Sequence, residues 1–360
     1  MLLRLTALEW LLKRLNLLPT PLLDTPLAPG IGKVLATACE LGLFDILNAG
    51  PLSAEEIAER LDCHPQRLRP LLQVLVATEY LHVRRARYSN CAVARRWLSA
   101  SSPVSIAPYI AHSPDIVALW EHLPEMMRTN QAVARMPYED DVARPEVQAA
   151  LARHYAGLAA LARILGKEIV YRVPLSAKST HLLDVGGSHG VYSLLFCRKH
   201  PALHATIVDL PPGIEAGKST TQDTEEHARI DFLCRDIVRE TFPVEFTQAF
   251  DVALYFHIAH LLPAEVNQQL LKRVVYCLKP GGLLVFVDQL TEQKHTSRLT
   301  TALVQLMALT VSALGGTCYP FATVKGWLEC AGLDHVRRQH LYTPGVSLIV
   351  GRKPRPVACS

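Results

Sequence analysis

The second half of the chain alternates short apolar runs with longer amphipathic segments. The apolar runs span residues 180–185, 205–210, 230–235, 251–256 and 283–289. Continuous apolar strands separated by helices are typical of a parallel sheet that is covered on both faces. Two further runs, 335–342 and 346–353, flank Pro344-Gly345 and predict an antiparallel hairpin at one edge. We therefore expect a doubly wound, Rossmann-like α/β domain.

The first half of the chain has a helical pattern instead. Ser53 followed by Glu56 forms a capping-box signature at the start of an amphipathic helix. Pro65 suits the first position of the next helix, and Pro70 should kink that helix or tighten its first turns. Residues 79–98 then alternate like a β-ribbon. The order helix, helix, ribbon is the winged-helix pattern.

A winged helix serves either to recognise DNA or to hold two subunits together. In the first interpretation Arg67, Arg69 and the ribbon arginines around Arg84–Arg87 would contact phosphates. Pro70 within the would-be recognition helix and the scarcity of base-reading Asn and Gln favour the dimerisation module. We expect no nucleic-acid partner.

The chain divides into three predicted parts. Residues 1–100 form an N-terminal helix and the winged-helix module, residues 101–175 a helical linker with a loop at 136–148, and residues 176–355 the α/β domain. Residues 1–19 are apolar but interrupted by charges, which predicts an amphipathic helix. We expect it to pack against a partner subunit; contact of residues 1–20 with a membrane surface is the alternative.

Composition and charge exclude few classes of protein. The chain has 360 residues, 49% of them hydrophobic and 19% charged, with a net charge of +4, as in an ordinary globular protein. The nine cysteines are scattered singly, with no CxxC pair and no metal-ligand spacing. We therefore expect reduced thiols, a cytoplasmic location and no metal.

The stretch "HLLDVGGSHGVYSLL", residues 181–195, holds the first candidate chemistry. A dinucleotide fingerprint, GxGxxG, would place Val185 where the first glycine belongs, so NAD is disfavoured. The spacing fits acidic-x-G-x-x-x-G, with Asp184 ahead of Gly186, Gly187 and Gly190. A carboxylate beside the ligand suits a cofactor that carries an ammonium and a sulfonium and has no phosphate.

Two further acids end the next two predicted strands. Asp209 follows the second strand, where a carboxylate can accept both hydroxyls of a ribose. Asp236 follows the third strand and could accept the amino group of an adenine. The ordered set of three acids with a glycine turn predicts a nucleoside-binding edge of the sheet.

Several segments resemble a known family. "LLDVGGSHG", "ATIVDLP", "CRDI", "LKPGGLLVFVD" and "SLIVGRKP" resemble the S-adenosylmethionine-dependent O-methyltransferases of the plant caffeate and bacterial hydroxyneurosporene type. "LFDILNAGPLSAEEIAERL" looks like the N-terminal dimerisation domain of that family. The resemblance implies a class I methyltransferase sheet, a homodimer joined through the N-terminal domain, and a small-molecule methyl acceptor, most often an aromatic hydroxyl of a secondary metabolite.

The resemblance also assigns residues to S-adenosylmethionine. They are Asp184, Gly186, Gly187 and Gly190 at the turn, Asp209 and Leu210 at the ribose, Asp236 and Ile237 at the adenine, and Phe256 near the purine. Plant members often carry a lysine where this chain has Phe256, which would make that contact apolar.

The resemblance places the catalytic base at His260, after the fourth strand. Leu261 replaces the aspartate that follows the base in the family, and Cys318 aligns near a further family acid. Asp288 or Glu292 could supply a carboxylate from the segment after the fifth strand. His257, three residues earlier, is the weaker candidate for the base.

Some alternatives stay open on the sequence alone. A base without an acidic partner would suit a thiol or activated carbon acceptor better than an alcohol, because thiolates already exist near neutral pH. A non-catalytic regulator that binds S-adenosylmethionine is the alternative outside the enzyme class. Five side chains could line an acceptor site, although core packing explains each as well: Trp120, Met126, Met127, Tyr155 and Tyr319.

Overall fold

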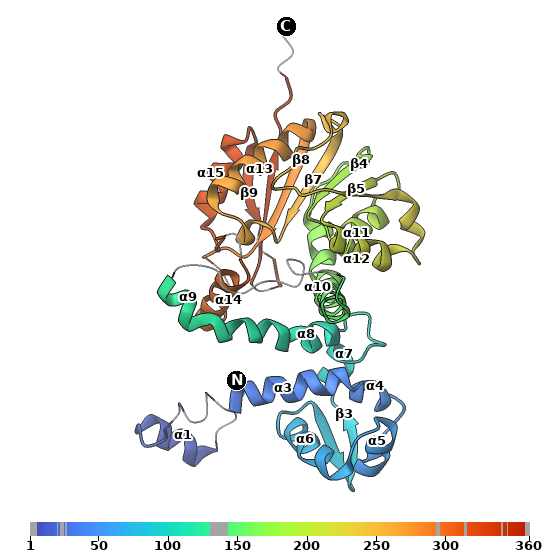
Figure 1. Cartoon of the computed structure of the whole chain (residues 1–360), viewed down its shortest axis with the longest axis vertical. Helices are drawn as coiled ribbons and strands as arrows, with labels where there is room; N and C mark the ends of the chain where they lie inside the picture. The colour runs from blue at the N-terminus through green and yellow to red at the C-terminus, as the bar shows by residue number, and fades with distance from the viewer. Residues whose placement is uncertain are drawn as a thin grey trace. The chain divides into compact units, whose positions relative to one another are not determined.

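The computed structural model of the chain describes residues 6–19, 21, 25, 27–129, 143–292, 296–312, 315–339, 341–343 and 345–356. It contains two compact units, Met1–Ala118 and Leu119–Ser360 (Figure 1). Among the described residues, no helix combines the length and the apolar character needed to cross a membrane.

The first unit is mainly helical, with a small antiparallel sheet in the order β1-β3-β2. Its elements are α1 (Ala7–Arg14), α3 (Leu27–Glu40), α4 (Leu43–Ile46), β1 (Leu52–Ser53), α5 (Ala54–Arg60), α6 (Pro65–Ala77), β2 (Leu81–Arg84), β3 (Arg87–Asn90), α7 (Ala92–Trp97) and α8 (Ala107–Ala118). The predicted winged-helix order of helix, helix and ribbon is therefore present.

Local signals in the sequence account for the helices of this module. Ser53 and Glu56 make both hydrogen bonds of the predicted capping box at the start of α5. Pro65 occupies the first turn of α6, and that helix continues through Pro70. Apolar side chains from α4, α5, α6 and β2 pack against one another to form the core of this unit. The module is thus built around its own hydrophobic core.

Two arginines that could contact phosphates in a DNA-binding protein are paired within this module. Arg69 of α6 bonds Glu55 of α5, and Arg87 of β3 lies 2.9 Å from Glu56. All four side chains are exposed. These ion pairs connect the second helix and the ribbon to α5.

The second unit contains a seven-stranded mixed sheet in the order β6-β5-β4-β7-β8-β10-β9. Its strands are β4 (His181–Val185), β5 (His204–Asp209), β6 (Ile230–Cys234), β7 (Phe250–Phe256), β8 (Leu278–Asp288), β9 (Asp334–Gln339) and β10 (Ser347–Arg352). The first five pair in parallel, whereas β10 pairs antiparallel with both β8 and β9. The doubly wound sheet with an antiparallel edge, predicted from the sequence, is confirmed.

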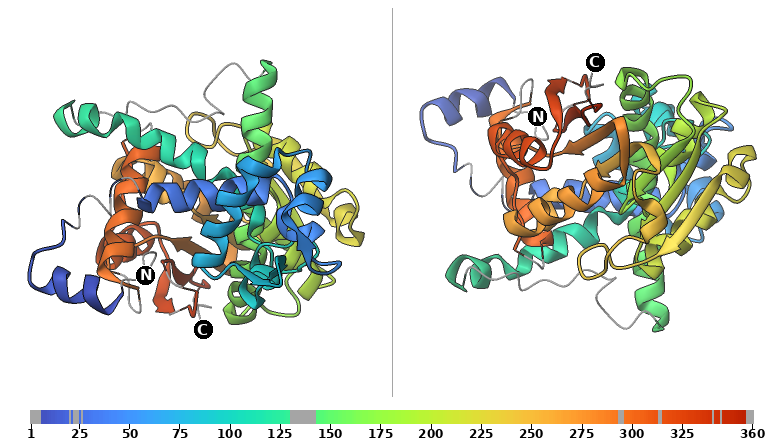
Figure 2. Two further views of the ribbon diagram at one scale, coloured as in Figure 1. Left: turned by 90° about the horizontal axis from the view of Figure 1, so that it is seen from below. Right: turned by 90° about the horizontal axis from the view of Figure 1, so that it is seen from above.

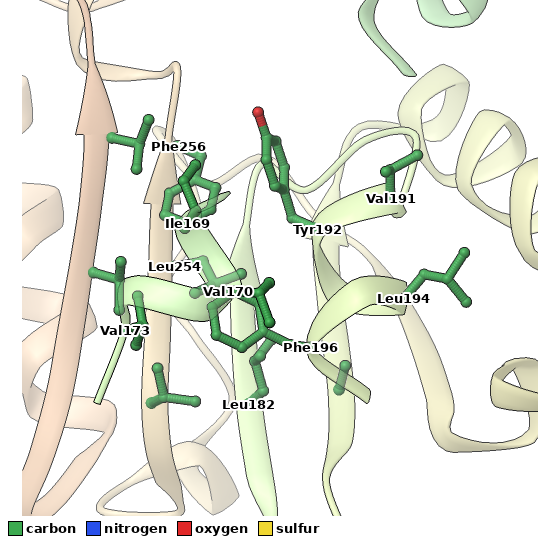
Figure 3. Close-up of a cluster of buried hydrophobic side chains, with 14 of the residues drawn as sticks. Ile169, Val170, Val173, Leu182, Val191, Tyr192, Leu194, Phe196, Leu254 and Phe256 are labelled. Carbon is green, nitrogen blue, oxygen red and sulfur yellow. The ribbon is translucent and has the colours of Figure 1, made fainter. Parts of the chain in front are cut away.

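Helices cover both faces of this sheet (Figure 2). α10 (Pro145–Arg172), α11 (Val191–Lys199) and α12 (Pro211–Thr221) pack on one face, against residues such as Leu182 and Leu254. Figure 3 shows part of this core. α13 (Ala264–Cys277) and α15 (Phe321–Cys330) pack on the other face, against Leu183 and Ala253. Successive strand residues thus enter opposite cores, as the strand period of two requires.

The remaining elements are η1 (Leu119–His122), α9 (Leu123–Thr129), η3 (Glu225–Arg229), η4 (Val244–Phe246), η5 (Ala259–Leu261) and α14 (Arg298–Val311). The loop predicted at 136–148 falls mostly outside the described residues. Its last four residues, 145–148, are helical, because Pro145 opens α10 at a position where its missing N–H costs nothing.

The strand order reverses between β4 and β7. The chain runs from β4 outward through β5 and β6, then returns to β7 on the other side of β4 and continues to β8. Open α/β sheets bind ligands outside the carboxyl ends of their strands at such a switch point. A ligand site is therefore expected among the residues that follow β4, β5, β7 and β8.

Candidate active site

The turn after β4 depends on its glycines. Gly186 and Gly190 have left-handed backbones, with φ of +65° and +71°, and Gly190 caps α11. The Gly186 N–H donates to the carbonyl of Val208 on β5 at 2.8 Å. Ser188 also has a positive φ, +33°, which is a strained conformation for a residue with a Cβ. The chain thus turns sharply and exposes backbone at the edge of the sheet.

Asp184 lies buried beneath this turn, with 1% of its surface exposed. Its Oδ2 accepts a hydrogen bond from the Ser193 hydroxyl at 2.7 Å, whereas its Oδ1 has no hydrogen-bond partner among the described residues. A Cβ at Gly187 would lie 2.5 Å from the Asp184 carboxyl carbon. Only glycine therefore lets the turn pass so close to the carboxylate.

Asp209 ends β5 beside the same turn. Its Oδ2 accepts a hydrogen bond from the Ser188 N–H at 2.8 Å, and its Oδ1 accepts one from the Leu210 N–H at 2.6 Å. A Cβ at Gly213, in α12, would lie 2.7 Å from this carboxyl carbon. The carboxylate is thus fixed in orientation by backbone donors on both sides.

The two carboxyl groups are costly to ionise in the free protein. Burial raises the pKa of Asp184 to about 7, and the nearby Asp209 adds to the rise. Burial likewise raises the pKa of Asp209 to about 6, against the two backbone hydrogen bonds. A cationic ligand would favour the ionised forms. The unpartnered Oδ1 of Asp184 and the narrow glycine turn fit a ligand with a positive charge and a nucleoside part.

The other residues assigned to the cofactor take different positions. A Cβ at Gly186 would lie 3.7 Å from Ile237, so Ile237 adjoins the turn, and Leu210 is partly exposed beside Asp209. Asp236 accepts hydrogen bonds from the Val238 and Arg239 N–H groups, which closes the turn after β6. These three assignments stay predictions.

Phe256 at the end of β7 is buried. Its ring packs edge-on against Tyr192, with 4.8 Å between ring centroids. In Figure 3 the Tyr192 ring stands over this core and its hydroxyl points away from the aliphatic side chains. The proposed contact of Phe256 with a purine stays a prediction, because these neighbours give the ring a packing role as well.

The predicted base, His260, lies in η5 and faces a carboxylate. Its Nδ1 is 2.7 Å from Asp288 Oδ1, at the end of β8, and its backbone N–H donates to Asp288 Oδ2 at 3.3 Å. Because an ionised carboxylate only accepts hydrogen bonds, the proton must lie on Nδ1. In the neutral imidazole Nε2 is then the acceptor nitrogen, which is the arrangement of a general base.

Electrostatics reinforce this pair. Burial opposes the charged imidazolium, but the Asp288 carboxylate outweighs burial and raises the pKa of His260 above its ordinary value. For Asp288, burial favours the neutral acid, yet the charge and hydrogen bond of His260 lower the pKa below its ordinary value. The pair is therefore polarised toward an ionised carboxylate and a basic imidazole.

Of the two carboxylates that the sequence offered, Asp288 is the one beside His260. Glu292 instead accepts a hydrogen bond from the Phe321 N–H at 3.1 Å, at the start of α15. Cys318 is buried, and burial followed by the charge of Asp288 raises the pKa of its thiol. His260 therefore has a carboxylate partner, Asp288, although Leu261 and Cys318 stand where the family carries acids.

The segment that carries His260 adjoins the glycine turn. Ile258, two residues before His260, would be 2.9 Å from a Cβ placed on Gly186. His257 has a left-handed backbone, with φ of +56°, and its Nε2 is 3.3 Å from the Tyr192 hydroxyl on α11. Burial lowers the pKa of His257 to about 4, which keeps this imidazole neutral. Tyr192 was not identified from the sequence, where it appeared only as one aromatic residue of a helix.

The residues suggested for an acceptor site have mixed environments. Met126 is buried and Met127 is exposed, while the buried Nε1 of Trp120 has no hydrogen-bond partner in the described part of the chain. Tyr155 contacts His154 edge-on at 5.3 Å. Tyr319 packs on Trp327 and donates a hydrogen bond to the Leu262 carbonyl. Tyr319 is thus tied to the segment that carries His260.

Comparison with known families accounts for most of the chain. Residues 29–100 match the O-methyltransferase dimerisation domain, and residues 120–319 match the O-methyltransferase domain. The second match alone covers more than half of the chain and includes the glycine turn, Asp209, His260 and Asp288.

Two relatives match over nearly their whole length. The 3-hydroxy-5-methyl-1-naphthoate 3-O-methyltransferase of Streptomyces sahachiroi is 28% identical, with 92% of this chain and 94% of the relative covered. The tetracenomycin polyketide synthesis 8-O-methyltransferase of Streptomyces glaucescens is also 28% identical, with 94% and 97% covered. Among solved structures, human N-acetylserotonin methyltransferase in complex with SAM shares the fold, with a TM-score of 0.78, 21% identity, and 93% and 98% of the two chains covered.

Proposed function

The chain belongs to the O-methyltransferase family of S-adenosylmethionine-dependent enzymes, and on that premise we propose that it methylates a phenolic hydroxyl on a small fused-ring aromatic acceptor. The two relatives described above act, by their names, on a naphthoate and in the synthesis of a polyketide. An acceptor of this class suits secondary metabolism. We further propose that the enzyme works as a cytoplasmic homodimer.

The observation that carries the proposal is the His260–Asp288 pair at 2.7 Å, on a segment whose Ile258 lies against the glycine turn. A phenol has an ordinary pKa of about 10, so little of it is ionised at neutral pH and a base is useful. His260 Nε2 would accept the phenolic proton, and Asp288 would stabilise the imidazolium that results. The alternatives of a thiol or carbon acceptor gained their support from a base without an acidic partner, and Asp288 removes that support.

The residues assigned to the cofactor would hold and orient S-adenosylmethionine. Bound S-adenosylmethionine supplies an activated methyl group on a sulfonium. Asp184 would hold the ammonium end through its Oδ1, and Asp209 would accept the ribose hydroxyls. His257 is held neutral, so it would add no positive charge that repels a cationic cofactor. The protein thus contributes alignment and one proton transfer.

Kinetics of site variants test this assignment. With 3-hydroxynaphthoate as the probe acceptor, we expect His260→Ala and Asp288→Asn to lower kcat by about 100-fold or more, because general-base help is worth about that factor. The dissociation constant for S-adenosylmethionine, measured by calorimetry, should change little. In wild type, kcat should fall as pH drops through the pKa of His260, since the imidazolium cannot accept a proton.

Glu292→Gln is the matched control, because Glu292 was the other candidate carboxylate and lies at α15 instead. It should keep kcat close to wild type. Full activity in His260→Ala would refute His260 as the base. A loss of kcat in Glu292→Gln equal to that in Asp288→Asn would refute Asp288 as the partner of His260.

A further inference from the structure

A buried amide holds the segment that carries His260. Asn267 of α13 has no exposed surface, and its Nδ2 lies 3.0 Å from the Ala259 carbonyl, 2.9 Å from the Leu262 carbonyl and 3.2 Å from the Pro263 carbonyl. The Ala259 and Leu262 carbonyls lie on either side of His260 along the chain. The amide therefore joins the two ends of the short helix that bears the base.

A buried tyrosine fixes the orientation of this amide. The Tyr255 hydroxyl, on β7, donates to Asn267 Oδ1 at 2.7 Å, and Tyr255 is also fully buried. If the amide were flipped, Oδ1 would face the carbonyl oxygens, which offer no proton. Tyr255 also stacks on Phe286 of β8, two residues before Asp288, with 5.6 Å between ring centroids. Tyr255 therefore lies on the strand that precedes His260 and contacts the strand that ends at Asp288.

The segment before α15 also holds η5. Ser312 donates to the Leu261 carbonyl at 2.9 Å, and Tyr319 donates to the Leu262 carbonyl at 2.7 Å. These bonds fix the chain just after His260. Of the three side chains, Asn267 is the one that also bonds the Ala259 carbonyl, so it holds the chain just before His260 as well.

We propose that Asn267, oriented by Tyr255, is a positioning residue that sets the geometry of the His260–Asp288 pair. The hydrogen bond of that pair depends on where η5 places His260, since Asp288 stands on a different strand. A shift of about 1 Å in such a pair is enough to weaken proton transfer. The proposal rests on the proposed function for its importance to catalysis, but the geometry it concerns exists in the free protein.

The test is NMR spectroscopy of the cofactor-free protein. Among the 15 histidines, His260 is identified as the one whose imidazole signals disappear in His260→Gln. In wild type, the Nδ1 proton should be protected by Asp288 and the imidazole should titrate above its ordinary value of about 6.5. Asp288, at the end of β8, and His257, directly after β7, both interact electrostatically with His260.

In Asn267→Leu we expect the protected Nδ1 proton to be lost and the pKa of His260 to move down toward or below the ordinary value. Tyr255→Phe keeps the buried ring and removes only the hydroxyl. It should therefore weaken the protection of the Nδ1 proton and lower the pKa of His260, each by less than Asn267→Leu does. With acceptor present, kcat should fall by about tenfold while the dissociation constant for S-adenosylmethionine stays within about twofold of wild type.

Asn90→Leu is the matched control. Asn90 is likewise a buried asparagine that donates to a backbone carbonyl, that of Phe44, but it lies in the first unit. It should lower the melting temperature without moving the signals of His260. Unchanged His260 signals in both Asn267→Leu and Tyr255→Phe would overturn the positioning role and leave the base assignment intact. Full methylation by His260→Ala would instead refute the base assignment, whatever the NMR result.

Discussion

Asp184 and Asp209 are held where an ionised carboxylate is poorly solvated. Burial raises the pKa of the first to about 7 and of the second to about 6. Such groups bind a cation well only after losing their protons. If the two acids hold S-adenosylmethionine as proposed, the cost of ionising them becomes part of the cost of binding it, and that part depends on pH.

Cofactor affinity should therefore rise with pH. Between pH 8 and pH 6 Asp184 becomes protonated in the free protein, so we expect the dissociation constant for S-adenosylmethionine to increase by about tenfold. Asp184→Asn should bind about 10- to 100-fold more weakly at pH 8 and lose most of this dependence, because a charge-assisted contact is removed. Calorimetric titrations of wild type and Asp184→Asn at pH 6 and pH 8 measure these dissociation constants. Equal affinities of the wild type at pH 6 and 8 would contradict the assignment of Asp184.

Single site residues could be predicted from the sequence where the residues of the site are close together along the chain. The turn from Asp184 to Gly190 could be identified because its acid and glycines lie within seven consecutive positions. The partner of His260 could only be narrowed to Asp288 or Glu292. The choice depends on the pairing of β7 with β8, where Phe256 lies opposite Val287, and no local pattern reveals that register.

Among the helices and strands, η5 is packed between α13 and the segment that precedes α15. A Cβ at Gly316 would lie 2.3 Å from the His260 carbonyl oxygen and 2.5 Å from the Leu261 carbonyl carbon. These neighbours are backbone atoms, so they cannot yield by turning a side chain. The close approach of the two segments requires glycine at this position.

Gly316→Ala should therefore destabilise the protein, by about 1–3 kcal/mol as for other overpacked sites, and lower kcat because η5 carries the proposed base. Gly326→Ala is the control, since a Cβ at Gly326, inside α15, would have no described atom within 4 Å beyond its own helix backbone and chain neighbours. It should stabilise by about 0.5–1 kcal/mol through helix propensity. Chemical denaturation of both variants provides the comparison. A Gly316→Ala protein as stable as wild type would show that the two segments are not in firm contact.

Elements with a strong periodic pattern were predictable, and contacts between distant elements were not. The five apolar runs and the two further runs all correspond to strands, and the capping box at Ser53 is formed. The pairing of Tyr255 with Asn267 joins a strand to a helix. In the sequence Tyr255 is only one apolar position of a strand and Asn267 one polar position of a helix, so neither could be assigned a role.

For the molecule as a whole, the match of residues 29–100 to a dimerisation domain supports a homodimer. α1 adds a second sign, because Leu8, Trp10 and Leu11 are exposed and none of the residues of this helix is buried in the single chain. Exposed apolar helix faces of this kind often mark a subunit contact.

Light scattering coupled to gel filtration should give a mass near twice 39.8 kDa. Replacing Trp10 and Leu11 together by Ala should weaken the dimer and shift the equilibrium toward monomer at low micromolar concentration. Val244→Ala, which removes an exposed apolar side chain from η4 in the second unit, should leave the mass unchanged. A monomeric wild type would rule out the dimer.

The fate of a labelled methyl group tests base-assisted O-methylation more directly than any other experiment. The protein would be incubated with S-adenosylmethionine carrying a trideuterated methyl and with 3-hydroxynaphthoate, and the product identified by mass spectrometry and NMR. We expect a trideuteromethyl ether at the hydroxyl oxygen, formed by wild type and reduced by about 100-fold or more in His260→Ala. Label on a ring carbon, or undiminished ether formation in His260→Ala, would contradict base-assisted O-methylation by this protein.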